Sequence, residues 1–359
     1  MVSPTRSRRL LLQWGIGLLG SWLCVWIVGS RSVNSILVRV YDQELDTITL
    51  REGDLIRWRS EGWADTRIGP HGLPGWAAND ATTRVILWGD SQVEGFCVND
   101  REKLAAQCIQ VANQKYQAAI DCLPMGRSGS DATDWSRIME RADELWDPAY
   151  HVWVVTELSD LIAITSTDQG KPMTGSWAAE SPAVICLAKK VHADAAFQAA
   201  RKFLFDSTTG GLRSLRWAVG PVVKPTEVTN EADPEFINAL LQKTRDRITL
   251  INKRFDRRLL LVYAPAVPRV RGELVLGHPD DEAWNAFVAM ASDEIHIIDL
   301  RESFRELWSE SGKFARGFHN GSASDGHLNR FGNYLVANAI VDWMSETGIL
   351  DSPSSMALP

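Results

Sequence analysis

The stretch that decides the fold is "VILWGDSQVEGF", residues 85–96. Four apolar residues run directly into Gly89, Asp90 and Ser91, a small polar turn from which a helix can begin. A buried strand that ends on such a turn either connects two elements or presents a reactive side chain to solvent. Chemical partners for Ser91 elsewhere in the chain would favour the second interpretation.

Apolar runs and amphipathic segments alternate through the rest of the chain. The strand candidates are residues 84–88, 118–123, 151–158, 258–264 and 295–300. Helical periodicity is clearest at residues 101–117, 131–145, 233–255 and 330–347. Continuous apolar strands separated by helices indicate a parallel sheet covered on both faces. We therefore predict an α/β fold, a three-layer sandwich with a central, mostly parallel five-stranded sheet.

The N-terminus predicts a membrane anchor. Residues 10–29 carry no charge and follow Arg6, Arg8 and Arg9. About twenty apolar residues, at roughly 1.5 Å each, span a hydrocarbon core of about 30 Å, and the preceding positive charge keeps the N-terminus cytoplasmic. We expect one N-terminal transmembrane helix and a single-pass membrane protein whose remaining domain is extracytoplasmic, in the periplasm or at the cell surface. A cleaved signal peptide is the alternative.

The pattern divides the chain into consecutive regions. We expect a cytoplasmic tail (1–9), the transmembrane anchor (10–29), a linker with short strands (30–80), a main domain (81–349) and a flexible tail (350–359). Residues 162–232 break the alternation of strands and helices and are predicted to be an insertion in the main domain.

Composition excludes some classes of function. A net charge of −7 without a basic stripe argues against nucleic-acid binding. The 15 tryptophans serve either packing or the stacking of sugar rings. Cys97, Cys108, Cys122 and Cys186 are even in number, so disulfides and buried thiols both stay open, and their spacing fits no zinc pattern. We expect no metal or organic cofactor, and the sequence leaves the oligomeric state open.

Chemically useful residues follow the predicted strands. They are Ser91, Gly126 and Gly129, Ser159 and Asp160, and, before the last helix, Asp325 and His327. The carboxyl ends of parallel strands meet at one edge of a sheet, where ligands bind. A hydroxyl, glycine amides and a carboxylate–imidazole pair supply the nucleophile, oxyanion donors, base and orienting group of a serine hydrolase.

Four motifs occur in the order of the sequence blocks of the SGNH/GDSL hydrolase superfamily, which the chain resembles over residues 84–347. They are "ILWGDSQVEG" (86–95), "MGRSGSDATDW" (125–135), "VVTELSDL" (154–161) and "SDGHLNRFGNYLVANAI" (324–340). The resemblance implies a flavodoxin-like sandwich with Ser91 as nucleophile, His327 as base and Asp325 as its partner. It also implies an oxyanion hole made by Ser91, Gly129 (with Gly126 the second choice) and Ser159.

Two positions depart from the family pattern. Ser159 stands where the family has asparagine, and Glu157 where it has glycine. The short Asp-x-His spacing of Asp325 and His327 is similar to the branch that contains membrane-associated polysaccharide O-acetylation proteins.

The resemblance implies an extracytoplasmic serine esterase or O-acyltransferase that acts through an acyl-Ser91 intermediate on an acylated envelope glycan. One alternative is a catalytically impaired protein of this fold that binds a glycan or a partner in the cell envelope, as the departures at residues 157 and 159 would allow. A second alternative is an esterase of small esters or lipids.

Overall fold

The computed structural model describes residues 4–79, 81, 83–165, 180–190, 193–194, 198, 234–271, 274–291, 294–321 and 324–350. Most of the predicted insertion, and the predicted tail after residue 350, lie outside these residues.

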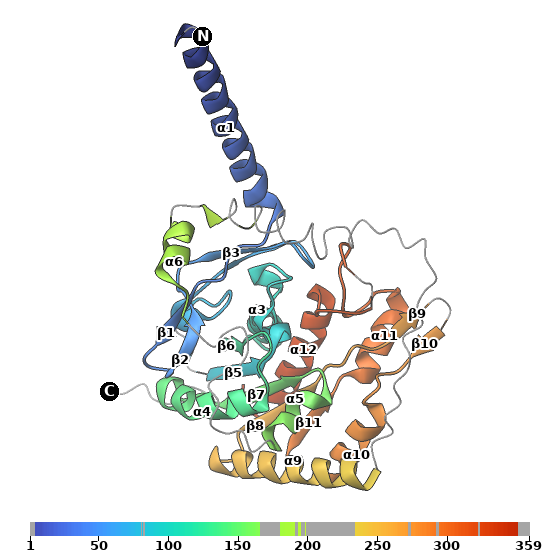
Figure 1. The fold of residues 1–359 in the computed structure, drawn as a ribbon. Coiled ribbons are helices and arrows are strands. Elements are labelled where there is room, and N and C mark those ends of the chain that lie inside the picture. Colours follow the sequence, from blue (N-terminus) through green and yellow to red (C-terminus); the bar gives the residue numbers. More distant parts are fainter. Residues whose placement is uncertain are drawn as a thin grey trace.

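A five-stranded parallel sheet forms the centre of the molecule (Figure 1). Its strands are β5 (Thr83–Gly89), β6 (Ile120–Gly126), β7 (Tyr150–Val155), β8 (Leu259–Tyr263) and β11 (His296–Asp299). Every neighbouring pair is parallel, and the order β11-β8-β7-β5-β6 places the first strand between the second and the third. This is the flavodoxin-like order, in which the winding reverses between β5 and β7. The predicted sheet is confirmed, and each predicted strand corresponds to one of these five.

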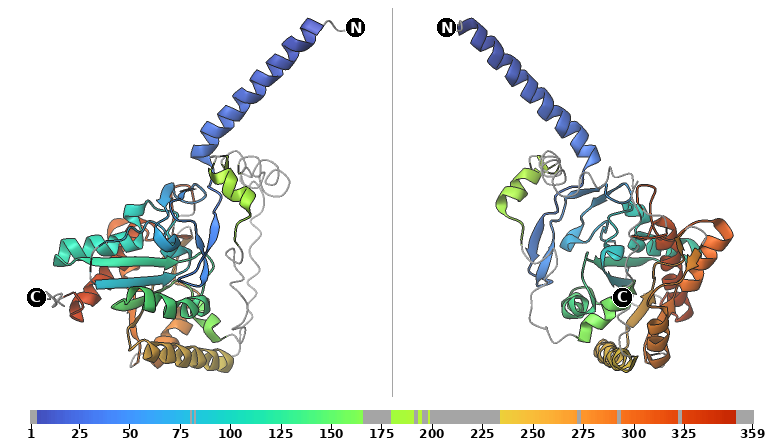
Figure 2. Two further views of the ribbon diagram at one scale, coloured as in Figure 1. Left: turned by 90° about the vertical axis from the view of Figure 1, so that its left-hand side faces the viewer. Right: turned by 45° about the vertical axis from the view of Figure 1, so that its right-hand side comes forward.

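Helices cover both faces of the sheet, so the predicted three layers are present (Figures 1 and 2). One face packs against α3 (Leu104–Tyr116), α11 (Arg301–Ser311) and α12 (Arg330–Glu346), and the other against α4 (Ala132–Trp146), α9 (Pro234–Arg254) and α10 (Asp281–Ala291). Side chains of β5 alternate between the two cores: Val85 and Leu87 join the first, Ile86 and Trp88 the second. Burial on both faces explains why the strand sequence is continuously apolar.

The segment before the sheet folds into two antiparallel hairpins. They consist of β1 (Arg39–Asp42) with β2 (Thr47–Leu50), and β3 (Leu55–Trp58) with β4 (Ala64–Arg67); the short helix η1 (Pro70–Gly72) follows. Leu50, Ile56 and Ile68 from this segment form a small core with Phe96, five residues beyond Ser91. The region predicted as a linker is thus packed beside the turn that carries Ser91.

Helix α1 (Pro4–Ser32) projects away from the rest of the protein (Figures 1 and 2). In the described part of the chain, no helix combines the length and the apolar character that crossing a membrane requires. The prediction of a transmembrane anchor at residues 10–29 is therefore wrong, as is the single-pass, extracytoplasmic topology that depended on it. Gln13, Ser21 and four glycines lie within residues 10–29 and lower the mean hydropathy of this segment.

The remaining elements are short. They are α2 (Ser91–Glu94), η2 (Asp100–Glu102), α5 (Leu158–Ile162), η3 (Ala163–Thr165), α6 (Ala183–Lys190), β9 (Arg269–Arg271) and β10 (Leu274–Leu276). Helix α6 belongs to the predicted insertion and lies against the N-terminal hairpins, where Nζ of Lys189 donates to the carbonyl of Leu55 at 3.1 Å. Cys97, Cys108, Cys122 and Cys186 are free thiols, so the disulfide alternative is not observed.

Candidate active site

Ser91 lies just beyond the carboxyl end of β5, where the winding of the sheet reverses. It is the first residue of α2, and Asp90 caps this helix by accepting the N–H of Gln92 on Oδ1 at 2.8 Å. Gly89 has no room for a side chain, because a Cβ there would lie 2.4 Å from Cγ2 of Val93. The tight packing of this turn holds Ser91 half-buried at the edge of the sheet.

His327 is the partner of Ser91. Its Nε2 lies 2.9 Å from Oγ of Ser91, within hydrogen-bonding distance. The loop that carries His327 is fixed to the nucleophile turn, because Oε1 of Gln92 accepts the N–H of Leu328 at 2.7 Å. The structure therefore brings the predicted nucleophile and the predicted base together across 236 residues of sequence.

The carboxylate that orients His327 belongs to Glu61, in the loop between β3 and β4. Its Oε2 lies 2.6 Å from Nδ1 of His327, and its Oε1 accepts the N–H of the same residue at 2.8 Å. Gly326 makes this approach possible: its φ is +82°, and a Cβ there would lie 2.2 Å from Oε1 of Glu61. Asp325, the predicted partner, instead accepts the N–H of Gly326 at 2.8 Å. In this structure Glu61 holds the position that the sequence assigned to Asp325.

The loop that carries Glu61 is clamped from two sides. Gly62 has a φ of +70°, and a Cβ there would lie 2.0 Å from the carbonyl oxygen of Cys97. Its N–H donates to Oδ1 of Asn320 at 2.8 Å, while Nδ2 of Asn320 donates to the carbonyls of Gly62 at 2.9 Å and Arg59 at 3.3 Å. These contacts set Glu61 at a fixed distance from His327.

Charge stabilises the Glu61–His327 pair. Burial acts to raise the pKa of Glu61, but hydrogen bonds from His327 outweigh it and hold this pKa below its usual value. Burial acts to lower the pKa of His327, but hydrogen bonds to Cys97 and Glu61 outweigh it and raise this pKa to about 10. An ionised Glu61 therefore favours the imidazolium form of His327.

The predicted oxyanion donors are tied to Ser91 less directly than His327 and Glu61 are. Gly129, with a φ of +77°, lies in the loop after β6 and has open space where a Cβ would be. Gly126 packs directly against α2, since a Cβ there would lie 2.3 Å from the amide nitrogen of Glu94. Ser159 is exposed, and its Oγ lies 3.4 Å from Oε2 of Glu157. The described contacts show no bond between Ser159 or Gly129 and the Ser91–His327 pair.

Two adjoining cavities surround the pair. The smaller, about 250 Å³, is lined by Asp90, Ser91, Gln92, Thr156, Glu157, Ala266, His278, Arg316, Asp325, Gly326 and His327. The larger, about 720 Å³, shares Glu157, Ala266, His278 and Asp325 with it and extends towards α5 and α9. A volume of this order is typical of small-molecule sites. Together the cavities form a cleft with Ser91 at one end.

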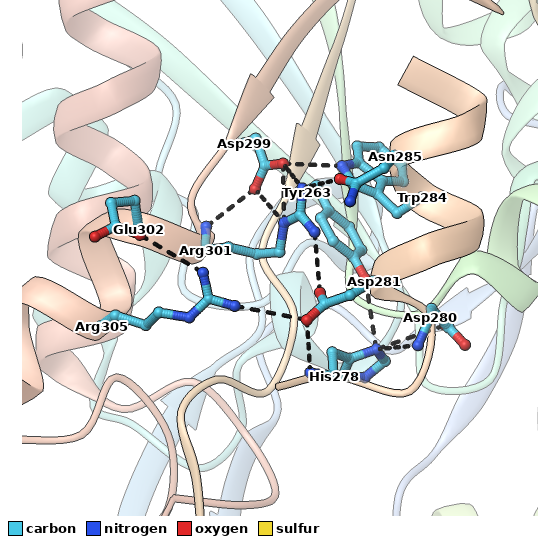
Figure 3. A network of polar contacts seen from close by, with 10 residues as sticks. All are labelled: Tyr263, His278, Asp280, Asp281, Trp284, Asn285, Asp299, Arg301, Glu302 and Arg305. Atoms are coloured by element: carbon cyan, nitrogen blue, oxygen red, sulfur yellow. Dashed lines mark hydrogen bonds and ion pairs between the residues drawn. The ribbon is translucent and has the colours of Figure 1, made fainter. Parts of the chain in front are cut away.

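His278 lines both cavities and is held by a network between β8, α10 and α11 (Figure 3). The guanidinium of Arg301 binds Asp299 at 2.7 Å and Asp281 at 3.0 Å, and Asp281 accepts the N–H of His278 at 3.0 Å. The N–H of Asp280 donates to Nδ1 of His278 at 3.3 Å. Burial lowers the pKa of His278, so its ring is neutral and carries its proton on Nε2, where it can donate a hydrogen bond.

The guanidinium of Arg316 holds the loop that carries His327 in place. It is 5% exposed, and its guanidinium donates to the carbonyl of Gly326 at 2.8 Å and to that of Ala264 at the end of β8. Burial lowers the pKa of Arg316 to about 10, which still leaves it charged at neutral pH. Arg316 thus ties the loop of His327 to the sheet. Neither Arg316 nor His278 lies in a motif that the sequence singled out.

Comparisons with known proteins give matches of low identity among solved structures. No family model and no curated protein matches the chain. Among solved structures, the acetyl xylan esterase AlAXEase is 15% identical and covers 73% of this chain and 98% of its own, with a TM-score of 0.39. A lipase/acylhydrolase from Enterococcus faecalis is 12% identical, covering 74% and 96%, with a TM-score of 0.36. A lipolytic protein of the G-D-S-L family from Desulfitobacterium hafniense is 10% identical, covering 72% and 98%, with a TM-score of 0.34.

These solved structures are named as a lipase/acylhydrolase, an acetyl xylan esterase and a G-D-S-L family protein, the kinds of protein that the sequence resemblance predicts. Because the identities do not exceed 15%, the chemistry of this chain has to be read from its own site.

Proposed function

We propose that the protein is a serine esterase or O-acyltransferase that works through an acyl-Ser91 intermediate. The observation that carries this proposal is the continuous chain of contacts from Ser91 Oγ to His327 Nε2, at 2.9 Å, and from His327 Nδ1 to Glu61, at 2.6 Å. A nucleophile, a base and an orienting carboxylate in hydrogen-bonding sequence define the triad arrangement, whatever the chain order.

The reaction proceeds in two halves. His327 takes the proton of Ser91 on Nε2 as Oγ attacks the ester carbonyl, and Glu61 stabilises the imidazolium. The backbone amides of Ser91 and Gly129 and the hydroxyl of Ser159 are the proposed donors to the oxyanion. The imidazolium then gives its proton to the leaving alcohol, and the acyl group stays on Ser91. Water releases the acid in an esterase; an acceptor hydroxyl takes the acyl group in a transferase.

An O-acylated glycan is the first candidate substrate. Its ester would lie at Ser91, and the polar side chains at the junction of the two cavities, Glu157, His278 and Asp325, offer hydrogen bonds to neighbouring hydroxyl groups. Two neighbours are named for such substrates, an esterase active on acetylated mannans and an acetyl xylan esterase. No tryptophan, tyrosine or phenylalanine stands among the described residues that line the cleft.

The larger cavity favours a second candidate, an ester with a longer aliphatic acyl chain. Away from Ser91 its described lining is mainly aliphatic: Leu158, Ile162, Ala163, Ile237, Leu240 and Ala283. Burying methylene groups there contributes about 0.8 kcal/mol for each. An increase of kcat/KM along p-nitrophenyl esters from acetate to octanoate would select this candidate, and a maximum at acetate would select the acetylated one.

The proposal is tested by comparing the full chain with Ser91→Ala. We expect a fluorophosphonate probe to label the wild type and not the variant, and p-nitrophenyl acetate hydrolysis to fall by about 10⁴-fold or more. A folded wild type that is no more reactive than Ser91→Ala would reject catalysis. The alternative, a protein of this fold that only binds a glycan or partner, would then apply.

A further inference from the structure

Cys97 brings a thiol close to the Glu61–His327 pair. Its Sγ, a carboxylate oxygen of Glu61 and a ring nitrogen of His327 all lie within 4.8 Å of one another. Cys97 is 3% exposed and its thiol is free. The hydrolytic cycle needs only the other two residues, so the thiol has no assigned purpose.

These three groups are a ligand set for zinc. Zn²⁺ is bound in proteins by thiolate, imidazole and carboxylate, and sites with three protein ligands leave the fourth position to water. A thiolate in the set favours zinc over magnesium or calcium, which take oxygen ligands. We propose that Glu61, Cys97 and His327 bind Zn²⁺, and that this binding switches off the esterase.

The geometry requires only small movements. Ligand atoms around a tetrahedral zinc lie roughly 3 to 4 Å apart, given bonds of about 2.0 to 2.3 Å. Nδ1 of His327 and Oε2 of Glu61 are 2.6 Å apart, so they must separate slightly as the cation enters between them. The side chains of His327 and Glu61 are 26% and 21% exposed, so a cation can reach them from solvent.

Binding would remove the base without touching Ser91. In the metal-free enzyme the neutral ring carries its proton on Nδ1, towards Glu61, and Nε2 is the acceptor for Ser91. Zn²⁺ takes the lone pair of Nδ1, so the ring proton moves to Nε2, which can then no longer accept a proton. Cys97 binds as thiolate and loses its thiol proton. Cys97 releases one proton for each cation bound, and the imidazolium form of His327 releases a second.

The position of the cluster argues for inhibition rather than catalysis. A metal that activates water or polarises a carbonyl has to lie next to the reacting atoms. Here the cluster includes Glu61, which contacts Nδ1 of His327, whereas Nε2 makes the contact with Ser91. The inhibitory consequence rests on the proposed function; the binding itself does not.

The test uses Co²⁺ and Zn²⁺ on the full chain, on Cys97→Ser and on a matched control, Cys186→Ser. Cys186 is half-buried on α6, and its Sγ contacts only the carbonyl of Ser181 among the described residues. Co²⁺ titration followed by absorption detects cobalt–thiolate charge transfer, and calorimetry in buffers of different ionisation enthalpy counts the protons released. Zn²⁺ inhibition of p-nitrophenyl acetate hydrolysis is measured against each protein's own metal-free rate.

We expect charge-transfer bands and zinc inhibition, reversed by EDTA, in the wild type and in Cys186→Ser. In Cys97→Ser the bands should vanish, and the zinc concentration for half-inhibition should rise by at least about tenfold, since even indirect ligand partners contribute that much. The absence of bands in the wild type, or their persistence in Cys97→Ser, would overturn the site. If Cys97→Ser does not fold, the charge-transfer bands and the proton count of the wild type still decide whether the metal binds through a thiolate. If the chain has no esterase activity, absorption and calorimetry judge the metal site alone.

Discussion

In the proposed mechanism, Glu61 determines which nitrogen of His327 can act as base. By accepting the Nδ1 proton it leaves Nε2 free to take the proton of Ser91, and its negative charge then stabilises the imidazolium. Asp325 is only two residues from His327 in sequence, and its carboxylate is engaged by the N–H of Gly326. Mutation can therefore distinguish the role of Glu61 from that of Asp325.

We expect Glu61→Gln to lower kcat/KM by about 10³- to 10⁴-fold, the size of effect that loss of the orienting carboxylate has in a serine protease triad. The amide of glutamine can donate to Nδ1 and so favours the wrong tautomer. Asp325→Asn is the matched control and should change kcat/KM by less than about tenfold. Steady-state kinetics with p-nitrophenyl acetate measures both. A larger loss in Asp325→Asn than in Glu61→Gln would return the orienting role to Asp325.

The same variant changes the pH dependence. The reaction needs neutral His327, whose pKa hydrogen bonds to Cys97 and Glu61 raise to about 10 against the opposing effect of burial. The kcat/KM of the wild type should therefore still rise with pH well above the usual histidine range. Removing the negative charge of Glu61 favours the neutral ring, so the rising limb of Glu61→Gln should move to lower pH while the plateau falls. An unchanged limb would show that Glu61 does not interact with the titrating base.

At the residue scale, the sequence predicted Ser91 and His327, which the structure brings into contact, but not Glu61. The first two sit in motifs directly after a strand and before a helix, where local pattern carries the information. Glu61 is 266 residues from His327 and lies in a hairpin loop without any motif of its own. Gly62 and Gly326, whose φ values are positive, were the available signals, but glycines of this kind mark turns in most proteins.

At the level of elements, the loop between β3 and β4 positions Glu61 against His327. Asn320→Ala removes one acceptor and two donor contacts that hold the loop at Gly62 and Arg59. At a net value of about 1 kcal/mol for each hydrogen bond, we expect kcat to fall by roughly tenfold or more as Glu61 loses its fixed position. Asn338→Ala is the control, because among the described residues Asn338 uses its side chain for a bond within α12, to Asp342 at 2.9 Å. The two variants are compared by steady-state kinetics and by thermal unfolding.

A loss of kcat in Asn320→Ala without a matching loss of stability relative to Asn338→Ala would support the positioning role. Equal kinetics in the two variants would contradict it.

Helix α9 supplies the aliphatic end of the larger cavity. We expect Leu240→Trp to fill part of that space and to lower kcat/KM for p-nitrophenyl octanoate by about tenfold, with little change for the acetate, because a few buried methylene groups are worth 1 to 3 kcal/mol. Leu250→Trp is the control on the same helix, since Leu250 is 60% exposed and lies outside this cavity. The ratio of the two substrates is the measurement, and an equal ratio in both variants would remove the cavity from acyl binding.

For the whole molecule, the sequence predicted the central sheet and its covering helices better than it predicted the N-terminal hairpins and helix α1. Strands buried on both faces have an unmistakable composition, so all five sheet strands were found. The N-terminal hairpins are short, half-exposed and joined by turns, and residues 30–80 were consequently interpreted as a linker. The membrane prediction rested on the absence of charge over residues 10–29, whereas the described part of the chain contains no helix that is long and apolar enough to cross a membrane.

The centre of the sheet contains a titratable group that couples stability to pH. His151 on β7 is fully buried; its Nδ1 accepts the indole N–H of Trp88 at 3.1 Å and its Nε2 donates to Asp143 at 3.1 Å. Burial, only partly offset by Asp143, lowers the pKa of His151 to about 4. The unfolded chain therefore binds a proton here below about pH 6.5, whereas the native state does so only near pH 4. The stability contributed is complete above pH 6.5 and is lost as the pH falls towards 4.

We expect this group to account for roughly 3 kcal/mol of the stability lost by the wild type between pH 7 and pH 4, at about 1.4 kcal/mol per unit of pKa difference. His151→Gln tests the expectation, because glutamine can still accept from Trp88 and donate to Asp143 but does not titrate. Denaturant unfolding at the two pH values should show a smaller acid loss in this variant, whatever its stability at pH 7. His296→Gln, at an exposed position on β11, should lose as much as the wild type. An equal acid loss in all three proteins would mean that His151 is protonated in the native state as readily as in the unfolded chain.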